Sequence, residues 1–300
     1  MSHDDEGIRP FDSEGRLAVP GGAVWYGIAG HLGEGATPLL CLHGGPGLDH
    51  RYFLPLTDLA EARPVILYDQ LDCGRSDHPG DPGNWTVGRF LDEIDAVRAG
   101  LGLDRVAVYG HSWGGLLAAA YGARRPEGLS ALVIASPLIS TARMQADMLA
   151  LRDALPDGRG AVMRACEAAG RFDDPAYLEA DGVFDRRHVC VADPWPGYLT
   201  DCVGAMNHDC FRHMFGRSNV AVTGTMAGYD GTPELARIAA PTLFTCGRAD
   251  FMRPETVADF AAQVPAAELE VYEAASHLPM IELRAAHAES LSRFLRRHDG

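Results

Sequence analysis

Apolar residues follow two different patterns along this chain. Short apolar runs, typical of buried strands, occupy residues 22–30, 38–43, 64–69, 105–110, 129–136, 241–246 and 269–273. Between them, helical spacing or small-residue composition predicts helices over 85–103, 116–125, 254–263 and 284–297. Strands that alternate with helices predict a mostly parallel sheet that helices cover on both faces.

The alternation stops in the middle of the chain. From residue 137 to 235 the pattern is helical or irregular, and six of the nine methionines lie there. We therefore predict an α/β core formed by residues 1–136 and 236–300, with a mainly helical cap, residues 137–235, inserted into it.

Charge and composition exclude several classes of function. The 41 acidic and 26 basic residues give a formal net charge of −15, so no nucleic-acid or membrane partner is expected. Every basic residue is an arginine, which excludes a P-loop lysine, a pyridoxal Schiff base and a Ser-Lys dyad. No apolar run reaches the roughly 18 residues of a membrane span, and the acidic N-terminus lacks a secretory signal pattern, so we expect a cytoplasmic protein.

The cysteines predict neither disulfides nor a metal site. There are seven of them and no Cys-x-x-Cys pair, so reduced thiols are expected. No other pattern calls for a metal or a cofactor, and none is expected.

A nucleophilic serine is indicated at residue 112. Residues 110–114, Gly-His-Ser-Trp-Gly, have the form G-x-S-x-G and lie between a predicted buried strand and a small-residue helix. This is the context of a nucleophile elbow, in which the flanking glycines let strand and helix approach closely. We predict that Ser112 is the nucleophile.

The order of residues along the chain supplies its partners. In folds with such an elbow, an acid follows a late strand and a histidine follows the last one. Asp250 follows the run at 241–246 and His277 follows the run at 269–273, so we predict the triad Ser112, Asp250 and His277.

A glycine-rich turn predicts the oxyanion hole. Residues 43–47, His-Gly-Gly-Pro-Gly, end the strand at 38–43 and can expose backbone N–H groups. We predict Gly45 as the first donor, with Gly44 as the alternative, and the N–H of Trp113 as the second. His43 is expected to be structural.

Several motifs together resemble the proline iminopeptidase family, serine aminopeptidases and amidases of the α/β-hydrolase fold. The similarity lies in residues 43–47, 68–77, 110–115 and 276–277, and in the cap in residues 187–190, 193–196 and 222–225. The resemblance implies release of an N-terminal amino acid or hydrolysis of an amino-acid amide.

The resemblance also implies carboxylates that hold the substrate's ammonium group. The family has one just before the Val-Thr-Gly-Thr stretch at 222–225 and another directly after the triad aspartate, where this chain has Asn219 and Phe251. The substrate-facing positions are thus uncharged. Four other carboxylates are candidate replacements: Asp209, Asp230, Glu255 and Glu282.

The cap is rich in methionine and aromatic residues. Methionine recurs at adaptable apolar binding surfaces, so Trp195, Met214 and Phe215 are predicted to bind a bulky apolar substrate group. The alternative is that these side chains form the cap's own core.

Three functions follow from these patterns. The first is cleavage of an amide bond in a small-molecule or short peptide-like substrate. The second, motivated by Asn219 and Phe251, is ester or lactone hydrolysis by the same triad. A non-catalytic binding protein is disfavoured by the complete triad and glycine turn, and Ser112 disfavours chemistry that needs an aspartate nucleophile.

Overall fold

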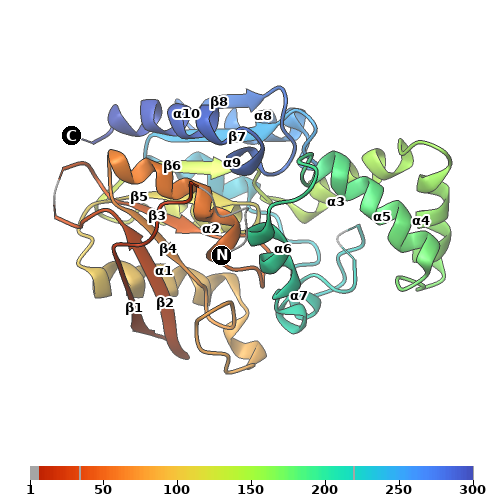
Figure 1. Ribbon diagram of the computed structural model, residues 1–300, viewed down its shortest axis with the longest axis horizontal. Coiled ribbons are helices and arrows are strands. Elements are labelled where there is room, and N and C mark those ends of the chain that lie inside the picture. Colours follow the sequence, from red (N-terminus) through yellow and green to blue (C-terminus); the bar gives the residue numbers. More distant parts are fainter. Residues whose placement is uncertain (1–6, 34, 219, 300) are drawn as a thin grey trace.

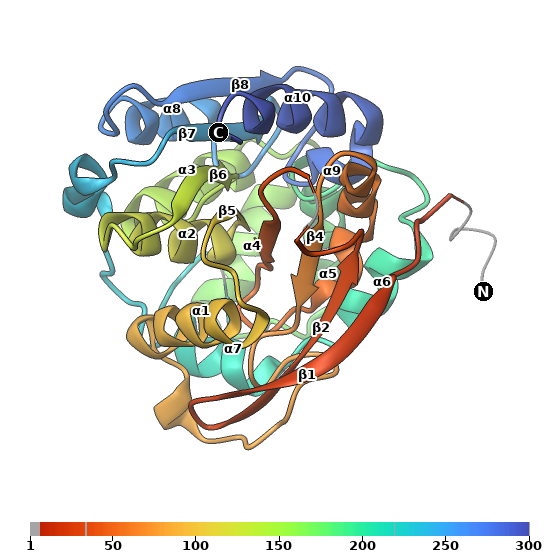
Figure 2. The same cartoon turned by 90° about the vertical axis from the view of Figure 1, so that its left-hand side faces the viewer.

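The computed structural model describes residues 7–33, 35–218 and 220–299. Eight strands form one sheet in the order β1-β2-β4-β3-β5-β6-β7-β8, with β1 and β8 at its two edges (Figure 2). Their bounds are Ser13–Val19, Gly22–Ala29, Leu39–Leu42, Val65–Tyr68, Val106–His111, Leu129–Ala135, Thr242–Gly247 and Glu268–Tyr272 for β1 to β8. Strand β2 is antiparallel to β1 and β4, and every neighbouring pair from β4 to β8 is parallel.

Helices cover both faces of this sheet. Side chains alternate along a strand, so Leu40 and Leu42 of β3 join one apolar cluster while Leu39 and Cys41 join the other. The first cluster includes side chains of α1 (Val87–Leu101), α2 (Trp113–Ala123) and α8 (Pro254–Ala261), and the second those of η2 (His50–Glu61), α9 (Pro279–Glu282) and α10 (Arg284–Arg296). The predicted mostly parallel sheet with helices on both sides is confirmed.

The long segment between β6 and β7 is mainly helical. It contains α3 (Thr141–Asp153), α4 (Arg159–Ala168), α5 (Pro175–His188), α6 (Gly197–Gly204), α7 (His208–Met214) and η4 (Thr232–Arg237). Helices α4 and α5 project to one side of the sheet, whereas α6 and α7 lie closer to the strands (Figure 1). We call this segment the insertion.

The insertion is attached to the turn that follows β3. The backbone N–H of Asn207 donates to the carbonyl of Gly47 at 2.8 Å, and its side-chain amide donates to the carbonyl of Asp72 at 2.8 Å. The glycine turn and the insertion are therefore neighbours.

The sequence pattern did not predict strand β1. Strand β1 is an edge strand whose residues are exposed or half-buried, so its sequence, Ser-Glu-Gly-Arg-Leu-Ala-Val, has no continuous apolar run. It is held by antiparallel pairing with β2. Edge strands with one solvated side give a weaker apolar signal than strands buried on both faces.

Two compositional expectations concern the cysteine thiols and the length of apolar helices. All seven cysteines are buried and carry free thiols, as predicted. None of the helices in the described part of the chain combines the length and apolar character that a membrane span requires.

Candidate active site

Ser112 lies at the sharp turn between β5 and α2. Its backbone has φ 57° and ψ −116°, a strained conformation for a residue with a side chain. A Cβ on Gly110 would overlap the carbonyl oxygen of Gly114, and one on Gly114 would overlap that of Leu42. Only glycine fits at these two positions, so strand and helix meet closely and present Ser112 at the N-terminus of α2.

Asp250 and His277 lie in the loops after β7 and β8. Because these strands are parallel to β5, their carboxyl ends meet at the same edge of the sheet as Ser112. The Nδ1 of His277 is 2.8 Å from Oδ1 of Asp250, which also accepts the N–H of Met252 at 2.8 Å. Both side chains are buried. The carboxylate thus holds the proton on Nδ1 and leaves Nε2 free to accept another.

The glycine turn after β3 passes directly beside the serine. A Cβ on Gly44 would lie 3.2 Å from the Cβ of Ser112, and Gly45 has φ 115°. The N–H of Gly44 donates to the hydroxyl of Tyr52 at 2.6 Å. With the Gly44 N–H engaged, Gly45 and Trp113 remain the candidate oxyanion donors. Trp113 begins α2, where backbone donors have no intrahelical acceptor.

A buried hydrogen-bond chain joins this turn to His277. The hydroxyl of Tyr52 is 3.1 Å from Nδ1 of His111, and Nε2 of His111 is 2.8 Å from the carbonyl oxygen of His277. Burial lowers the pKa of His111 well below its usual range and raises that of Tyr52 well above it, so both are neutral.

Because Tyr52 and His111 are both neutral, the donor and the acceptor of each hydrogen bond between Gly44 and His277 can be assigned. A carbonyl can only accept, so Nε2 of His111 carries the hydrogen and Nδ1 accepts. The Tyr52 hydroxyl must then donate to His111, and its oxygen accepts from Gly44. The sequence analysis assigned no role to Tyr52 or His111. His111 entered it only as part of the Gly-His-Ser-Trp-Gly motif, and nothing in the local pattern marks Tyr52.

His43 is hydrogen bonded on both ring nitrogens. Its Nδ1 is 3.0 Å from the carbonyl oxygen of Gly44, and its Nε2 accepts the N–H of Gln70 at 2.9 Å. The Gln70 side chain also accepts the indole N–H of Trp113 at 3.0 Å. Burial lowers the pKa of His43, so the ring is a neutral link between the glycine turn and the elbow.

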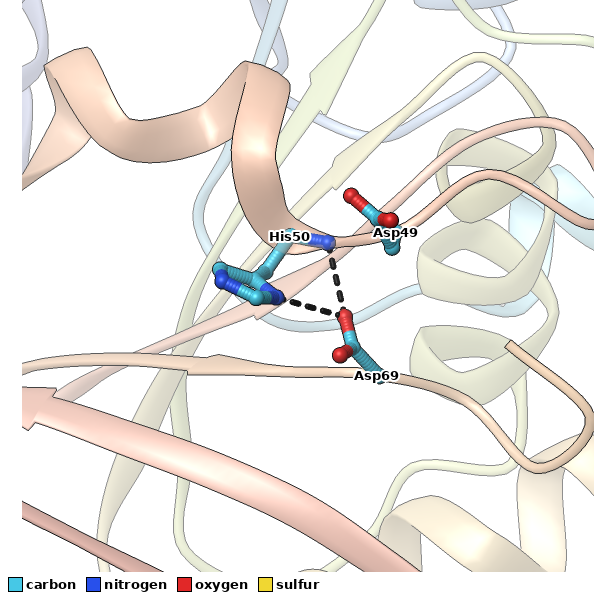
Figure 3. Close-up of side chains that lie close together, drawn as sticks. All are labelled: Asp49, His50 and Asp69. Atoms are coloured by element: carbon cyan, nitrogen blue, oxygen red, sulfur yellow. Dashed lines mark hydrogen bonds and ion pairs between the residues drawn. The ribbon is translucent and has the colours of Figure 1, made fainter. Parts of the chain in front are cut away.

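Asp49, His50 and Asp69 form the one group of potential metal ligands found among the described residues (Figure 3). Oδ1 of Asp69 accepts from the backbone N–H of His50 at 2.7 Å and lies 2.8 Å from its Nδ1, while Oδ2 accepts the N–H of Arg75 at 2.8 Å. Asp49 is paired with the guanidinium of Arg51. These bonds give the cluster a structural role at the start of η2.

A cavity of about 410 Å³ lies within the insertion and reaches Phe251. The ring of Phe251 stacks on that of His277, with centroids 3.9 Å apart and an interplanar angle of 30°. The cavity therefore reaches a side chain that contacts His277, the candidate catalytic histidine. Its walls are mostly apolar and include Met148, Met163, Phe184, Val203 and Met206.

The other predicted substrate-binding residues lie elsewhere. Met214 and Phe215 are fully buried in the apolar cluster that extends into the insertion and are not among the side chains that line this cavity. Trp195 lines a separate groove on the insertion. Asn219 lies outside the described residues.

None of the four carboxylates proposed from the sequence lines the cavity. Asp209 and Glu255 pair with Arg212 and Arg253, Asp230 accepts the N–H of Thr232, and Glu282 accepts the N–H groups of Val191 and Ser276. Two other carboxylates do line it, Asp181 and Asp185 of α5. Their spacing of four residues on one helix was the signal available in the sequence.

Comparison with known proteins gives consistent matches. Residues 37–176 match a family model described as alpha/beta hydrolase fold. The chain is 37% identical to a proline iminopeptidase of Heyndrickxia coagulans over 271 residues, which is 90% of this chain and 94% of that one.

Two solved structures are similar over nearly the whole chain. The crystal structure of VinJ has a TM-score of 0.92 and 35% identity, and covers 96% of this chain and all of that one. The proline iminopeptidase of Mycobacterium smegmatis has a TM-score of 0.90 and 33% identity, with coverage of 96% and 99%.

Proposed function

Because the chain belongs to the proline iminopeptidase family and has the α/β-hydrolase fold, we propose that this serine hydrolase cleaves the amide bond of a small aminoacyl or amide substrate with a bulky apolar group. The observation that carries the proposal is the 2.8 Å bond between His277 and Asp250, beside a strained turn that presents Ser112. The glycine turn next to the serine supports acyl transfer in particular.

The residues act in the following order in this proposal. Ser112 Oγ attacks the amide carbonyl and passes its proton to Nε2 of His277, and Asp250 stabilises the imidazolium. The N–H groups of Gly45 and Trp113 donate to the oxyanion. The imidazolium then protonates the leaving amine as the C–N bond breaks, and a water molecule, deprotonated by His277, hydrolyses the acyl-enzyme.

Preorganised donors are expected to contribute much of the rate enhancement. Loss of one oxyanion donor costs about 2.7–4 kcal/mol of transition-state stabilisation in serine hydrolases. Here hydrogen bonds connect the glycine turn to the elbow. His43 accepts the backbone N–H of Gln70, and the Gln70 side chain accepts the indole N–H of Trp113.

The cavity supports a substrate larger than a single amino acid. At about 30 Å³ per water molecule, its volume of about 410 Å³ corresponds to roughly 14 waters. The stacked Phe251 gives it an apolar wall where it approaches His277. A bulky apolar group on the substrate would fill this space and exclude water from the reacting carbonyl.

The test compares matched substrates. An aminoacyl anilide should be hydrolysed with a kcat that Ser112→Ala abolishes, and a fluorophosphonate probe should label the wild-type protein on Ser112 alone. A matched ester that is cleaved while the anilide is not would replace amide hydrolysis with esterase or lactonase activity. Absence of both turnover and labelling would overturn the assignment of the triad.

A further inference from the structure

The backbone of Ala249 joins the insertion to both triad loops. Its carbonyl oxygen is 2.8 Å from Nδ1 of His188, the last residue of α5, and its N–H donates to the carbonyl of Ala275 at 3.0 Å. A carbonyl only accepts, so Nδ1 of His188 carries the hydrogen. Ala249 directly precedes Asp250. Ala275 lies two residues before His277, so the loop of the acid is hydrogen bonded to the insertion and to the loop of the histidine.

Glu282 of α9 supplies a second connection. Its Oε2 accepts the backbone N–H of Ser276 at 2.8 Å. Its Oε1 accepts the Ser276 hydroxyl and also the backbone N–H of Val191, the latter at 2.7 Å. Ser276 is fully buried and directly precedes His277. Val191 lies in the insertion, three residues after His188, so one carboxylate binds the histidine loop and the insertion together.

The two connections close a ring around the loops of the acid and the histidine. Its members are joined by the hydrogen bonds above or by the chain itself, in the order His188, Ala249, Ala275, Ser276, Glu282 and Val191. A shift of either loop would change the 2.8 Å distance between Oδ1 of Asp250 and Nδ1 of His277. Displacing a catalytic group by about 1 Å can lower a rate by about a hundredfold.

We propose that Glu282 and His188 are positioning residues that hold the loops of His277 and Asp250 at the separation the triad requires. Neither side chain is among those that line the cavity, so their removal should lower kcat and leave KM nearly unchanged. The inference rests on the proposed function for its triad, and it does not depend on which bond the triad cleaves.

Glu282→Gln tests the carboxylate. The amide has one acceptor oxygen, and its NH2 group would face a backbone N–H in either orientation, that of Val191 or that of Ser276. Both kcat on an aminoacyl anilide and the rate of fluorophosphonate labelling of Ser112 should fall by about tenfold to a hundredfold, with KM within about twofold of wild type. Rates are divided by the fraction of protein that the probe labels at completion, so a loss of folded protein does not enter them.

Two variants at His188 separate its hydrogen bond from the packing of its ring. His188→Leu removes the donor, whereas His188→Asn keeps an N–H group close to the position of Nδ1. Both lose the ring contact with Phe184, whose centroid is 5.0 Å away. The labelling rate and kcat should fall by about tenfold in His188→Leu and return to within about twofold of wild type in His188→Asn.

Glu273→Gln is the matched control. Glu273 lies in the same loop as Ser276, is exposed and pairs with Arg248, so its amide variant should react like wild type. Unchanged rates per labelled site in Glu282→Gln would overturn the role of Glu282, and equal rates in His188→Leu and His188→Asn would overturn that of His188.

The labelling rates also separate this inference from the proposed amide hydrolysis. If the wild-type protein is labelled but cleaves no anilide, amide hydrolysis alone is refuted, and slower labelling of Glu282→Gln and His188→Leu still supports the positioning role. A wild-type protein that the probe does not label on Ser112 would overturn the triad and this inference with it.

Discussion

The hydroxyl of Tyr52 is the most informative single group to remove. It accepts the N–H of Gly44 at 2.6 Å and donates to Nδ1 of His111 at 3.1 Å. Tyr52→Phe would keep the ring and delete only this link between the glycine turn and His277. In this variant Nδ1 of His111 would lose the hydroxyl that donates to it. Because burial keeps His111 neutral, its ring carries a single hydrogen, and moving that hydrogen to Nδ1 would break the bond from Nε2 to the His277 carbonyl.

In Tyr52→Phe two buried groups lose their hydrogen-bond partner, the N–H of Gly44 and Nδ1 of His111. An unsatisfied buried donor or acceptor costs about 1–3 kcal/mol, so the loss of two partners should lower the free energy of unfolding by roughly 2–6 kcal/mol. The oxyanion donors are retained but less well held, so kcat should fall by about tenfold to a hundredfold, less than the loss of a whole donor. The substrate cavity lies elsewhere, and KM should change little.

Tyr109→Phe is the matched control for this experiment. Its hydroxyl is also fully buried, yet it has no hydrogen-bond partner among the described residues. The substitution removes one oxygen from the same core without breaking a link to the site, so kcat should stay near wild type. Steady-state kinetics on one anilide and urea denaturation measure both variants. If Tyr52→Phe and Tyr109→Phe have the same kcat, the positioning role of Tyr52 is refuted.

Four further outcomes are expected. Ser112→Ala should lower kcat by about 10⁴-fold or more with the thermal midpoint retained. Asp250→Asn should cause a loss of similar order, because the amide would favour the wrong tautomer of His277. With Phe251 at a position where the family has a carboxylate, kinetics on substrate pairs that differ only at the α-amine should show less than a hundredfold preference for the free amine. Asp185→Asn should raise the thermal midpoint more at pH 8 than at pH 5, because the folded state loses stability as pH rises from the unfolded pKa towards about 7 and this carboxylate ionises.

The sequence predicted the sheet well because its central strands are buried on both faces. Runs such as residues 38–43 and 105–110 carry no polar interruption, and they correspond to β3 and β5 in the structure. The same reasoning failed for β1, whose polar edge is stabilised by pairing with β2 rather than by burial. Pairing between strands leaves no signal in the composition of one strand.

The candidate site was predictable where chain order constrains geometry. Ser112, Asp250 and His277 each follow a strand, and parallel strands bring those positions to one edge of the sheet. The lining of the cavity was not predictable in this way. Met214 faces the core and Met206 the cavity, although both are methionines of the insertion, because their orientation depends on how α6 and α7 pack.

Besides enclosing a cavity, the insertion contacts the core at two loops that carry candidate site residues. Asn207 bonds to Gly47 in the turn that carries Gly45, and His188 of α5 bonds to Ala249 in the loop that carries Asp250. Helix α5 also lines the cavity with Tyr177 and Phe184. Under the proposed function, a substrate group that fills the cavity would contact the same helix that abuts the loop of Asp250. Contacts far from the scissile bond can then raise kcat as well as affinity, if they are stronger in the transition state than in the ground state.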